Sequence, residues 1–469
     1  MKKTKIICSI GPASTNPDIM EKMVNEGMNV ARINFSHSDI KNREEIEESV
    51  IEVRKRTGKN IGLLFDTKGP EFRNGMIENN HAELVEGKTF RIVKEEVVGN
   101  SERFSVNHPE ILSDLNIGDI LLLDDGLMRA KVISKEEDGA TFEVVNGGVL
   151  VSRKSLNVPG VHLNIPFISD QDREDIIYAC KHDGDFLAAS FVSTAEDVFE
   201  IRKILEEYNS SMKIISKIEN TTALQNIEAI IDASDGIMVA RGDLGVEAPL
   251  NELPHYQKDI IKMCREHSKF VIVATEMLES MKNNPRPTRA EVSDVANAIE
   301  DGTDAVMLSA ETTVGKFPVG VVKIMAEICE TQENHSNYDT NYHFNRQNNI
   351  AERVAISTVD AANDLNAKLI ITGTLSGYTA RKLSNMKPNC PIFATCNDEK
   401  VARTLSLFYG VDASVIKFYS SIDDMINSSI ERAKEKYTLN EGDTVVVTGG
   451  FVGNTYESHT TNLMKIVKI

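Results

Sequence analysis

The sequence lacks three features: a long hydrophobic run, a paired set of cysteines and an excess of basic residues. No apolar stretch in its 469 residues approaches the roughly 20 residues that span a bilayer, so we expect no transmembrane helix. The N-terminus begins Met-Lys-Lys and continues as a strand-like run from Thr4 to Ile10, without the apolar stretch and cleavage site of a secretory leader. We therefore expect a cytoplasmic protein with no membrane partner.

The cysteines and the charge balance exclude further classes. The six cysteines show neither a CxxC spacing nor a cluster with histidines at the spacing of zinc ligands, so reduced, unpaired thiols are the simpler interpretation. With 52 basic and 71 acidic side chains, the formal net charge of −19 opposes nonspecific binding to nucleic acid. No nucleic-acid partner is expected, and an anionic substrate would need cations placed locally around it.

A short apolar run followed by an amphipathic stretch recurs along the chain, as is typical of βα units and a parallel sheet. Eight runs are predicted to be strands, with a long interruption after the third: Lys5–Ile10, Val30–Phe35, Ile61–Phe65, Phe186–Val192, Lys213–Ile218, Gly236–Val239, Phe270–Ala274 and Ala305–Leu308. Eight units indicate an α/β fold with a closed (β/α)8 TIM barrel rather than an open sheet. One barrel helix should begin at a capping box of Thr288 and Glu291 and end at Gly302.

Two other regions have a different pattern. From about Pro70 to Pro166, short alternating runs separated by Gly, Asn and Asp turns predict a small β-barrel domain inserted into the TIM barrel. Because it follows the third strand, it should lie over the C-terminal face of the barrel as a lid. After the polar stretch Gln332–Asn349, a resumed βα pattern predicts an open α/β domain. The expected division is 1–69 and 167–335 for the barrel, 70–166 for the lid and 336–469 for the C-terminal domain.

Polar residues follow most predicted barrel strands, at the end where enzymes of this fold keep their chemistry. In chain order these are Arg32, Asn34, Ser36, His37, Asp66, Thr67, Lys68, Lys217, Glu219, Arg241, Asp243, Thr275, Ser309 and Glu311. Residues two apart on a strand point the same way, so Lys217 and Glu219 can face one site. Each residue alone has an ordinary explanation as a surface ion pair, a helix cap or a turn residue. Their convergence on one rim favours a functional site.

These residue types suggest phosphoryl chemistry. Glu219 and Asp243 are ligands that Mg²⁺ accepts while it keeps water and substrate phosphates as its other ligands. Lys217 beside them would be a point charge for phosphoryl oxygens, and arginines suit bidentate phosphate contacts. A second pocket, for a hard cation of low charge, is indicated by neutral oxygens and one carboxylate at Asn34, Ser36, Asp66 and Thr67.

Six separated runs resemble signatures of the pyruvate kinase family, in the family's order: TKIICSIGPA (4–13), ARINFSH (31–37), DTKGPEFR (66–73), SKIEN (216–220), MVARGDLGVE (238–247) and ATEMLESM (274–281). The resemblance covers essentially the whole chain and is to bacterial-type members without an extra C-terminal extension. It implies a phosphotransferase that moves the phosphoryl group of phosphoenolpyruvate to ADP, giving pyruvate and ATP, in the last step of glycolysis.

The resemblance also implies roles for individual residues. Four residues would be catalytic: Lys217, Arg32, Thr275 and Arg73. Five would contact the substrate: Arg32, Lys217, Gly242, Asp243 and Thr275. Three would contact the nucleotide: Asn34, His37 and Arg73. Two would bind Mg²⁺ or Mn²⁺, namely Glu219 and Asp243, and four would bind K⁺, namely Asn34, Ser36, Asp66 and Thr67. By the same resemblance, Thr275 would lie near the proton that the released enolate takes up, and Ser309 and Glu311 could extend a relay.

A loop in the C-terminal domain also resembles a phosphate site. It follows an apolar strand and opens a helix, where backbone N–H and hydroxyl groups can bind phosphate. In the family this loop binds a phosphorylated sugar or nucleotide effector, and its residues here are Thr374, Leu375, Ser376, Gly377, Tyr378 and Thr379. A start rich in Ser and Thr is otherwise an ordinary helix cap. A homotetramer is implied by the resemblance alone.

Three positions deserve comparison with the family's usual residues, and two alternative functions compete with the assignment. Glu276 stands where many members have Gln, and Gln171 stands where a lysine is common, which bears on the nucleotide contacts. Glu71 resembles the potassium-dependent members. The alternatives are a lyase or aldolase acting on phosphoenolpyruvate, which would have no reason for a lid beside a nucleotide site, and a catalytically silent binding protein. The second would be expected to lose Lys217 or a magnesium carboxylate.

Overall fold

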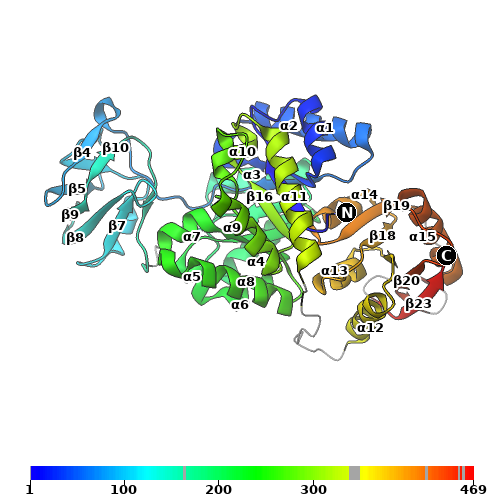
Figure 1. Cartoon of the computed structure of the whole chain (residues 1–469). Helices are drawn as coiled ribbons and strands as arrows, with labels where there is room; N and C mark the ends of the chain where they lie inside the picture. Colours follow the sequence, from blue (N-terminus) through cyan, green and yellow to red (C-terminus); the bar gives the residue numbers. More distant parts are fainter. Residues whose placement is uncertain are drawn as a thin grey trace.

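The computed structural model describes residues 2–161, 165–336, 338, 349–417, 421–452, 455–456 and 460–469. It has three parts, with a barrel in the centre of Figure 1, an inserted β domain on one side and a C-terminal α/β domain on the other. The predicted fold class, a TIM barrel with an inserted β domain and an open C-terminal α/β domain, is confirmed.

The barrel closes in the strand order β1-β16-β15-β14-β13-β12-β3-β2, with all neighbours parallel. Its strands are β1 (Lys5–Ser9), β2 (Val30–Asn34), β3 (Gly62–Asp66), β12 (Phe186–Ala189), β13 (Lys213–Ile218), β14 (Gly236–Ala240), β15 (Phe270–Ala274) and β16 (Ala305–Leu308). Seven of them agree with prediction to within one residue at each end. β12 ends at Ala189 instead of Val192, because the chain turns away from the ladder where Phe191 adopts a φ of +57°.

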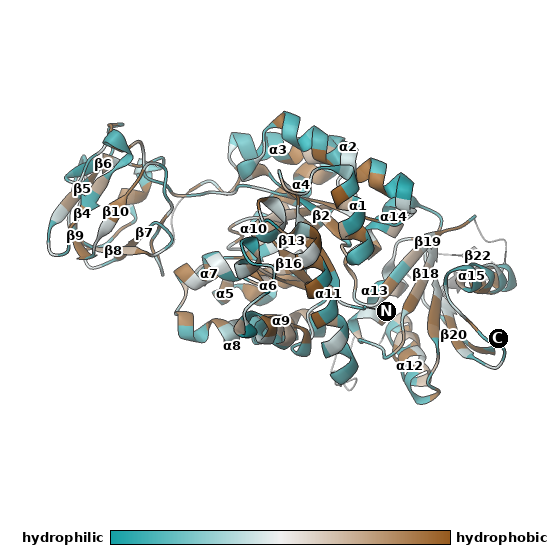
Figure 2. Cartoon of the chain, turned by 45° about the horizontal axis from the view of Figure 1, so that its top comes forward, coloured by the Kyte–Doolittle hydropathy of each residue, from teal (hydrophilic) through white to brown (hydrophobic). Residues whose placement is uncertain are grey.

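Helices surround the barrel, and Figure 2 shows that their hydrophobic residues alternate with hydrophilic ones. They are α1 (Pro17–Glu26), α2 (Ile40–Thr57), α3 (Asp170–Lys181), α4 (Ala195–Glu207), α5 (Thr221–Gln225), α6 (Ile227–Ala233), α7 (Arg241–Glu247), α8 (Leu253–Glu266), α9 (Arg289–Glu300), α10 (Ala310–Thr313) and α11 (Pro318–His335). The predicted capping box starts α9, since Thr288 N–H donates to Glu291 and Glu291 N–H donates to Thr288 Oγ1. None of the described helices is both long and apolar enough to cross a bilayer.

The inserted domain consists of a six-stranded sheet, in the order β11-β7-β8-β9-β5-β6, and a two-stranded sheet of β10 and β4. The strands are β4 (Ala82–Leu84), β5 (Thr89–Val93), β6 (Arg103–Ser105), β7 (Ile120–Leu123), β8 (Met128–Glu136), β9 (Gly139–Asn146), β10 (Gly148–Leu150) and β11 (Leu156–Asn157). They share one core, in which the Phe90 ring stacks on Phe104 at 5.1 Å and on Phe142 at 5.4 Å. This core is separate from that of the barrel, so the insertion can move as a unit.

The C-terminal domain is a five-stranded sheet in the order β19-β18-β17-β20-β23, in which only β23 is antiparallel to its neighbour. Its elements are α12 (Ile350–Asp364), β17 (Leu369–Gly373), α13 (Tyr378–Asn385), β18 (Ile392–Cys396), α14 (Glu399–Thr404), β19 (Val411–Val415), α15 (Ile422–Lys436), β20 (Thr444–Gly449) and β23 (Leu463–Lys468). A short hairpin of β21 (Phe451–Val452) and β22 (Thr455–Tyr456) lies between β20 and β23.

The C-terminal domain packs against the amino-terminal end of the barrel. Phe270, at the start of β15, meets Phe186 edge-on at 6.3 Å and Phe408 of the C-terminal domain at 5.1 Å. The barrel interior and the C-terminal domain therefore share one continuous hydrophobic cluster. Polar groups join them too, because the fully buried Lys387 ammonium pairs with buried Asp304, which precedes β16. This end of the barrel is thereby closed, and the carboxyl end is left for a site.

Replacing Lys387 with alanine should lower the free energy of unfolding by about 3 kcal/mol, because Asp304 would stay buried without its cation. Urea unfolding followed by circular dichroism would measure the change. The matched control is Lys434→Ala, which breaks an exposed pair with Glu431 and should cost less than about 0.5 kcal/mol. A Lys387→Ala protein as stable as the control would contradict the assigned importance of the buried pair.

Candidate active site

The residues predicted at the strand ends gather in one cavity of about 220 Å³ at the carboxyl end of the barrel. Its lining comprises Arg32, Asn34, Ser36, His37, Asp66, Thr67, Lys68, Glu71, Arg73, Ser190, Phe191, Lys217, Glu219, Met238, Ala240, Asp243, Thr275 and Met307. Three residues from the same prediction, Arg241, Ser309 and Glu311, are not among the lining residues. The cavity therefore brings together residues from β2, β3, β13, β14 and β15 that are far apart in the sequence.

Lys217 is the central cation of this cavity. Its ammonium donates to Ser190 Oγ at 2.7 Å and forms ion pairs with Glu219 Oε1 at 2.8 Å and Asp66 Oδ1 at 3.2 Å. Burial disfavours its charge, but Asp66, Glu219 and Asp243 outweigh that effect and raise the pKa of Lys217. The lysine is therefore a fixed positive charge at neutral pH rather than a proton donor.

Glu219 is a buried carboxylate whose negative charge is only partly balanced by its surroundings. Its side chain is 1% exposed, and Oε2 accepts the Phe191 N–H at 2.7 Å. Burial raises the pKa of Glu219 to about 7; Lys217 opposes this shift and the charge of Asp243 adds to it. Oε1 touches Lys217 but accepts no hydrogen bond of normal geometry from any described residue. A second cation between Glu219 and Asp243 would relieve this imbalance.

The donor set of these two carboxylates fits one kind of metal. In the part of the chain that the structure describes, no cluster of three or more His, Cys, Asp or Glu side chains could hold a metal ion. Glu219 and Asp243 supply only oxygen ligands, and only two side chains. That set suits Mg²⁺ or Mn²⁺ with water and substrate as the remaining ligands, and does not suit zinc.

Asp66 is shared between two cations. Arg32 Nε lies 2.6 Å from Asp66 Oδ2, and Arg32 Nη1 donates to Ser9 Oγ at 2.7 Å. Burial would raise the pKa of Asp66, but Arg32 and Lys217 more than offset it and lower the pKa. Asp66 is thus ionised, and its charge is largely balanced. The neutral oxygens of Asn34, Ser36 and Thr67 line the same cavity, which therefore has little net charge on that side.

The turn after β15 is strained where it reaches the cavity. Thr275 and Glu276 have φ values of +68° and +54°, which side chains other than glycine adopt at a cost of about 1–3 kcal/mol each. Thr275 Oγ1 accepts the Gly242 N–H at 2.7 Å. Arg241, expected at the rim, instead turns back and donates to the carbonyls of Thr275 at 2.8 Å and Glu276 at 3.2 Å. Its role is to hold the strained turn.

Ser309 and Glu311 do not line the cavity. Glu311 accepts the backbone N–H groups of Ser309 at 2.7 Å and Leu278 at 3.2 Å, and burial raises its pKa. The Ser309 hydroxyl is buried and has no hydrogen-bond partner among the described residues. Since neither side chain is bonded to Thr275, a proton relay through them stays a prediction.

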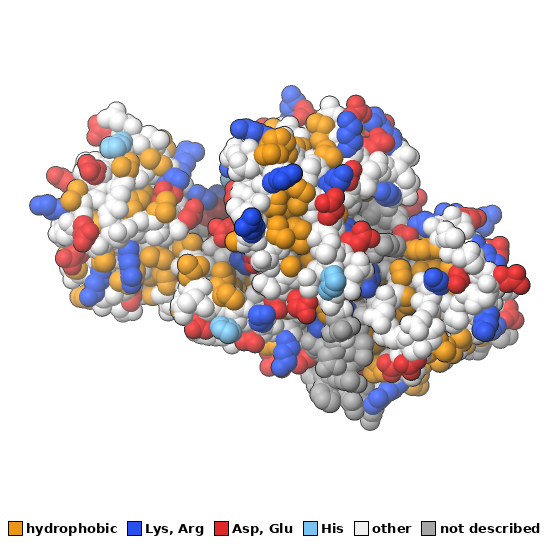
Figure 3. Space-filling model, in the orientation of Figure 1, with side chains coloured by type: hydrophobic (Ala, Val, Ile, Leu, Met, Phe, Trp, Pro, Cys, Tyr) orange, Lys and Arg blue, Asp and Glu red, His pale blue; other side chains and the backbone are white. Residues whose placement is uncertain are grey.

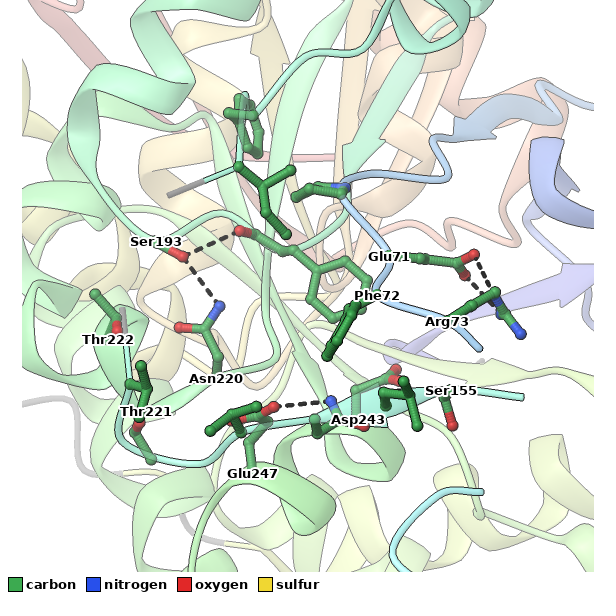
Figure 4. A pocket seen from close by; sticks show the side chains of 18 of the residues that line it. Glu71, Phe72, Arg73, Ser155, Ser193, Asn220, Thr221, Thr222, Asp243 and Glu247 are labelled. Carbon is green, nitrogen blue, oxygen red and sulfur yellow. Dashed lines mark hydrogen bonds and ion pairs between the residues drawn. The ribbon is translucent and has the colours of Figure 1, made fainter. Parts of the chain in front are cut away.

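The first residues of the inserted domain reach the same cavity. Arg73 pairs with both oxygens of Glu71, at 2.8 and 3.0 Å, and donates to the Arg153 carbonyl at 2.8 Å. This pair and Asp243 also line a second cavity, of about 200 Å³, between the insertion and the barrel (Figure 4). Asp243 lines both cavities, and Figure 3 shows the surface dipping between the two parts. To bind a phosphate, the Arg73 guanidinium must give up at least one of its two hydrogen bonds to Glu71 or donate to both groups at once.

The predicted phosphate loop lies at the other end of the molecule, in the C-terminal domain. The loop from Thr374 follows β17, and Gly377, with a φ of +79°, leads into α13 at Tyr378. The Ser376 hydroxyl is buried with no hydrogen-bond partner in the described parts of the chain. Thr379 Oγ1 lies 2.8 Å from Thr461 Oγ1. A free buried hydroxyl beside a helix start is compatible with a phosphate ligand.

Comparison with known proteins gives consistent matches. The family model described as pyruvate kinase, barrel domain, matches residues 1–322, and the one described as pyruvate kinase, alpha/beta domain, matches 352–467. Pyruvate kinases from Bacillus licheniformis and Geobacillus stearothermophilus are 43% and 44% identical, over 99% of this chain and 80% of each relative. A solved pyruvate kinase structure from Cryptosporidium parvum is 39% identical, with a TM-score of 0.94 over 100% of this chain and 96% of that one.

Proposed function

Because the chain belongs to the pyruvate kinase family, we propose that the cavity around Lys217 is where it transfers the phosphoryl group of phosphoenolpyruvate to ADP. The protein is a phosphotransferase whose products are pyruvate and ATP. The observation that carries the proposal is the Lys217 ammonium, buried against Asp66 and Glu219 beside the second carboxylate Asp243. Both substrates are polyanions, so the transfer needs fixed positive charge where the phosphoryl group moves.

The proposed metal ligands follow from the charges in the cavity. Glu219 and Asp243 would hold Mg²⁺ or Mn²⁺, and Asn34, Ser36, Asp66 and Thr67 would hold K⁺. Bound there, the divalent ion would neutralise phosphoryl oxygens and orient the substrate. Because the charge of Asp66 is already balanced, the pocket suits a monovalent ion. At position 71 the chain has Glu, as the potassium-dependent members of the family do.

The chain's own groups would act on the substrates as follows. Arg32 and Lys217 bind the phosphoryl group, and the backbone at Gly242 and Asp243 with the Thr275 hydroxyl binds the carboxylate. The Gly242 N–H, which now donates to Thr275, would turn to the substrate. Asn34, His37 and Arg73 contact the nucleotide.

In the transfer step, a β-phosphate oxygen of ADP forms a bond to phosphorus as the bond to the enol oxygen breaks. The electron pair of the broken bond stays on the enol oxygen, and Lys217 remains protonated and balances the charge in flight. The enolate then takes a proton at carbon, near Thr275, with Ser309 and Glu311 as the proposed relay. Closure of the inserted domain would bring Arg73 to the phosphates and exclude water.

The wider assignments rest on family membership. We place the reaction at the last step of glycolysis, in the cytoplasm, and propose a homotetramer. We also propose the division into a catalytic barrel at 1–69 and 167–335, a lid at 70–166 and an effector-binding domain at 336–469. The loop Thr374–Thr379 would bind the phosphate of a sugar or nucleotide effector.

Lys217→Met should lower kcat roughly 100- to 1,000-fold, because a fixed charge on the phosphoryl oxygens is lost. Pyruvate formation from phosphoenolpyruvate and ADP, coupled to a reporter enzyme and repeated without Mg²⁺ or without K⁺, measures this and the metal dependence. The control is Lys213→Met, at the opposite end of the same strand and near Asp235, which should stay within about threefold of the native rate. Unchanged turnover in Lys217→Met would remove the lysine from the mechanism.

The affinity for Mg²⁺ should increase between about pH 6 and about pH 8, because the metal displaces a proton from Glu219, whose pKa is raised to about 7. Calorimetric titration of the substrate-free protein in buffers of different ionisation enthalpy would count the released proton. Glu219→Gln cannot release that proton and should bind weakly with no such pH dependence. A native affinity that is flat over this range would contradict the assignment of Glu219.

Regulation through the C-terminal loop predicts that a phosphorylated ligand shifts the saturation curve for phosphoenolpyruvate. Ser376→Ala should raise about tenfold the ligand concentration that gives half of this shift, because a hydroxyl available to the phosphate is lost. The rate without ligand should be unchanged. Titrations with fructose bisphosphate, AMP and sugar monophosphates provide the measurement. A curve that none of them moves would end this part of the proposal.

A further inference from the structure

Ser190 and Phe191, which follow the shortened strand β12, hold two of the proposed active-site residues. Ser190 Oγ accepts the Lys217 ammonium at 2.7 Å, and the Phe191 N–H donates to Glu219 Oε2 at 2.7 Å. Ser190 is 3% exposed, and Phe191 takes a φ of +57°, which a bulky side chain adopts only where its surroundings enforce it. This 190–191 corner therefore sets the direction of both Lys217 and Glu219.

Hydrogen bonds restrict the orientation of the Ser190 hydroxyl. Its oxygen accepts a hydrogen bond from the Lys217 ammonium, so its own O–H donates to another acceptor. The closer acceptor is the Thr67 carbonyl at 2.7 Å, against 3.3 Å for Asp66 Oδ1. The Ser190 N–H also donates to Thr67 Oγ1 at 3.1 Å. The corner is thus fastened to the segment that leaves β3 and enters the inserted domain.

That segment presses on the corner through Gly69. With a φ of +71°, Gly69 packs so closely that a Cβ there would lie 2.9 Å from Ser190 Cβ and 3.1 Å from Phe191 Cδ2. Its N–H donates to Asp172 Oδ1 at 2.9 Å. Asp172 also closes the capping box of α3 with Ser169, just after the chain returns from the insertion. One carboxylate therefore ties the outgoing and returning connections of the inserted domain together.

We infer that the 190–191 corner is a positioning element that transmits the position of the inserted domain to Lys217 and Glu219. A rotation of the insertion that displaces Gly69 would reach the hydroxyl that holds the ammonium, because no side chain separates Gly69 from Ser190. Ser190 acts on the transfer only through Lys217. The inference rests on the proposed roles of Lys217 and Glu219, and it adds a reason for closure to govern the rate.

Ser190→Ala should lower kcat about tenfold while KM for phosphoenolpyruvate changes less than about threefold, because Lys217 keeps its charge and loses its direction. The matched control is Ser216→Ala, which removes an equally buried hydroxyl from the residue next to Lys217. That hydroxyl is bonded to Ser234 at 2.6 Å on the other side of β13, so kcat should stay within about twofold. Equal kcat in the two variants would overturn the inference.

A double-mutant cycle tests the link to the inserted domain. Asp172→Ala releases the Gly69 N–H and should lower kcat by a few-fold, about threefold. If the Gly69–Asp172 contact acts through Ser190, the double variant should have about the kcat of Ser190→Ala alone. If the two losses multiply, this contact and Ser190 act independently and the inference is wrong. A general loss of stability from the broken cap would also multiply, so it cannot imitate the expected result.

The native enzyme separates this inference from the proposal beneath it. Native protein that makes no pyruvate from phosphoenolpyruvate and ADP would overturn the proposed function. Active native protein with Lys217→Met inactive and Ser190→Ala indistinguishable from Ser216→Ala would overturn only the role of the corner.

Discussion

The ion pairs of Lys217 with Asp66 and Glu219 are the constraint on which the rest of the structure depends. Charges this buried are costly unless each is paired and hydrogen-bonded, so the barrel must deliver every partner to within about 3 Å. It does so from β3 and β13, and Arg32 of β2 balances the second oxygen of Asp66. Glu219 beside Asp243 remains incompletely balanced, and this is the basis on which we propose a further cation there.

The two ends of the barrel differ in how a second domain is attached to them. At the amino end, the C-terminal domain extends the barrel's own core through Phe408 and Phe270 and adds the buried pair of Lys387 and Asp304. That end is rigid. At the carboxyl end, the inserted domain keeps a core of its own and contacts the barrel through polar groups such as Asn157, which donates to Glu247 at 2.8 Å. Because its core is separate from that of the barrel, the inserted domain can move more readily than the C-terminal domain.

Strained backbone is also found at the same carboxyl end. Thr275, Glu276 and Phe191 all take left-handed backbone conformations around the cavity, and Arg241 supports one of these turns from behind. Such conformations persist because the surrounding bonds enforce them, and they direct a backbone N–H or a hydroxyl to a chosen point. Family membership argues against the alternatives of a lyase or an aldolase. The presence of the lysine and both carboxylates argues against a catalytically silent binding protein.

Much of the architecture could be predicted from the sequence, because strand patterns and strand ends are local properties. The period of the apolar runs predicts all eight barrel strands, and the short alternating runs from Pro70 to Pro166 predict the β structure of the insertion. The antiparallel edge strand β23 escapes prediction because its six residues are only partly buried. Pattern alone cannot say which way a side chain at a strand end turns: Arg241 turns away from the cavity, and Arg73 pairs with Glu71. Ser190, which lies inside the predicted strand Phe186–Val192, instead follows the end of β12 and holds Lys217. Arg241 and Ser190 find their partners 34 and 27 residues away, and Arg73, besides its neighbour Glu71, meets the Arg153 carbonyl 80 residues away, so the tertiary structure alone decided these directions.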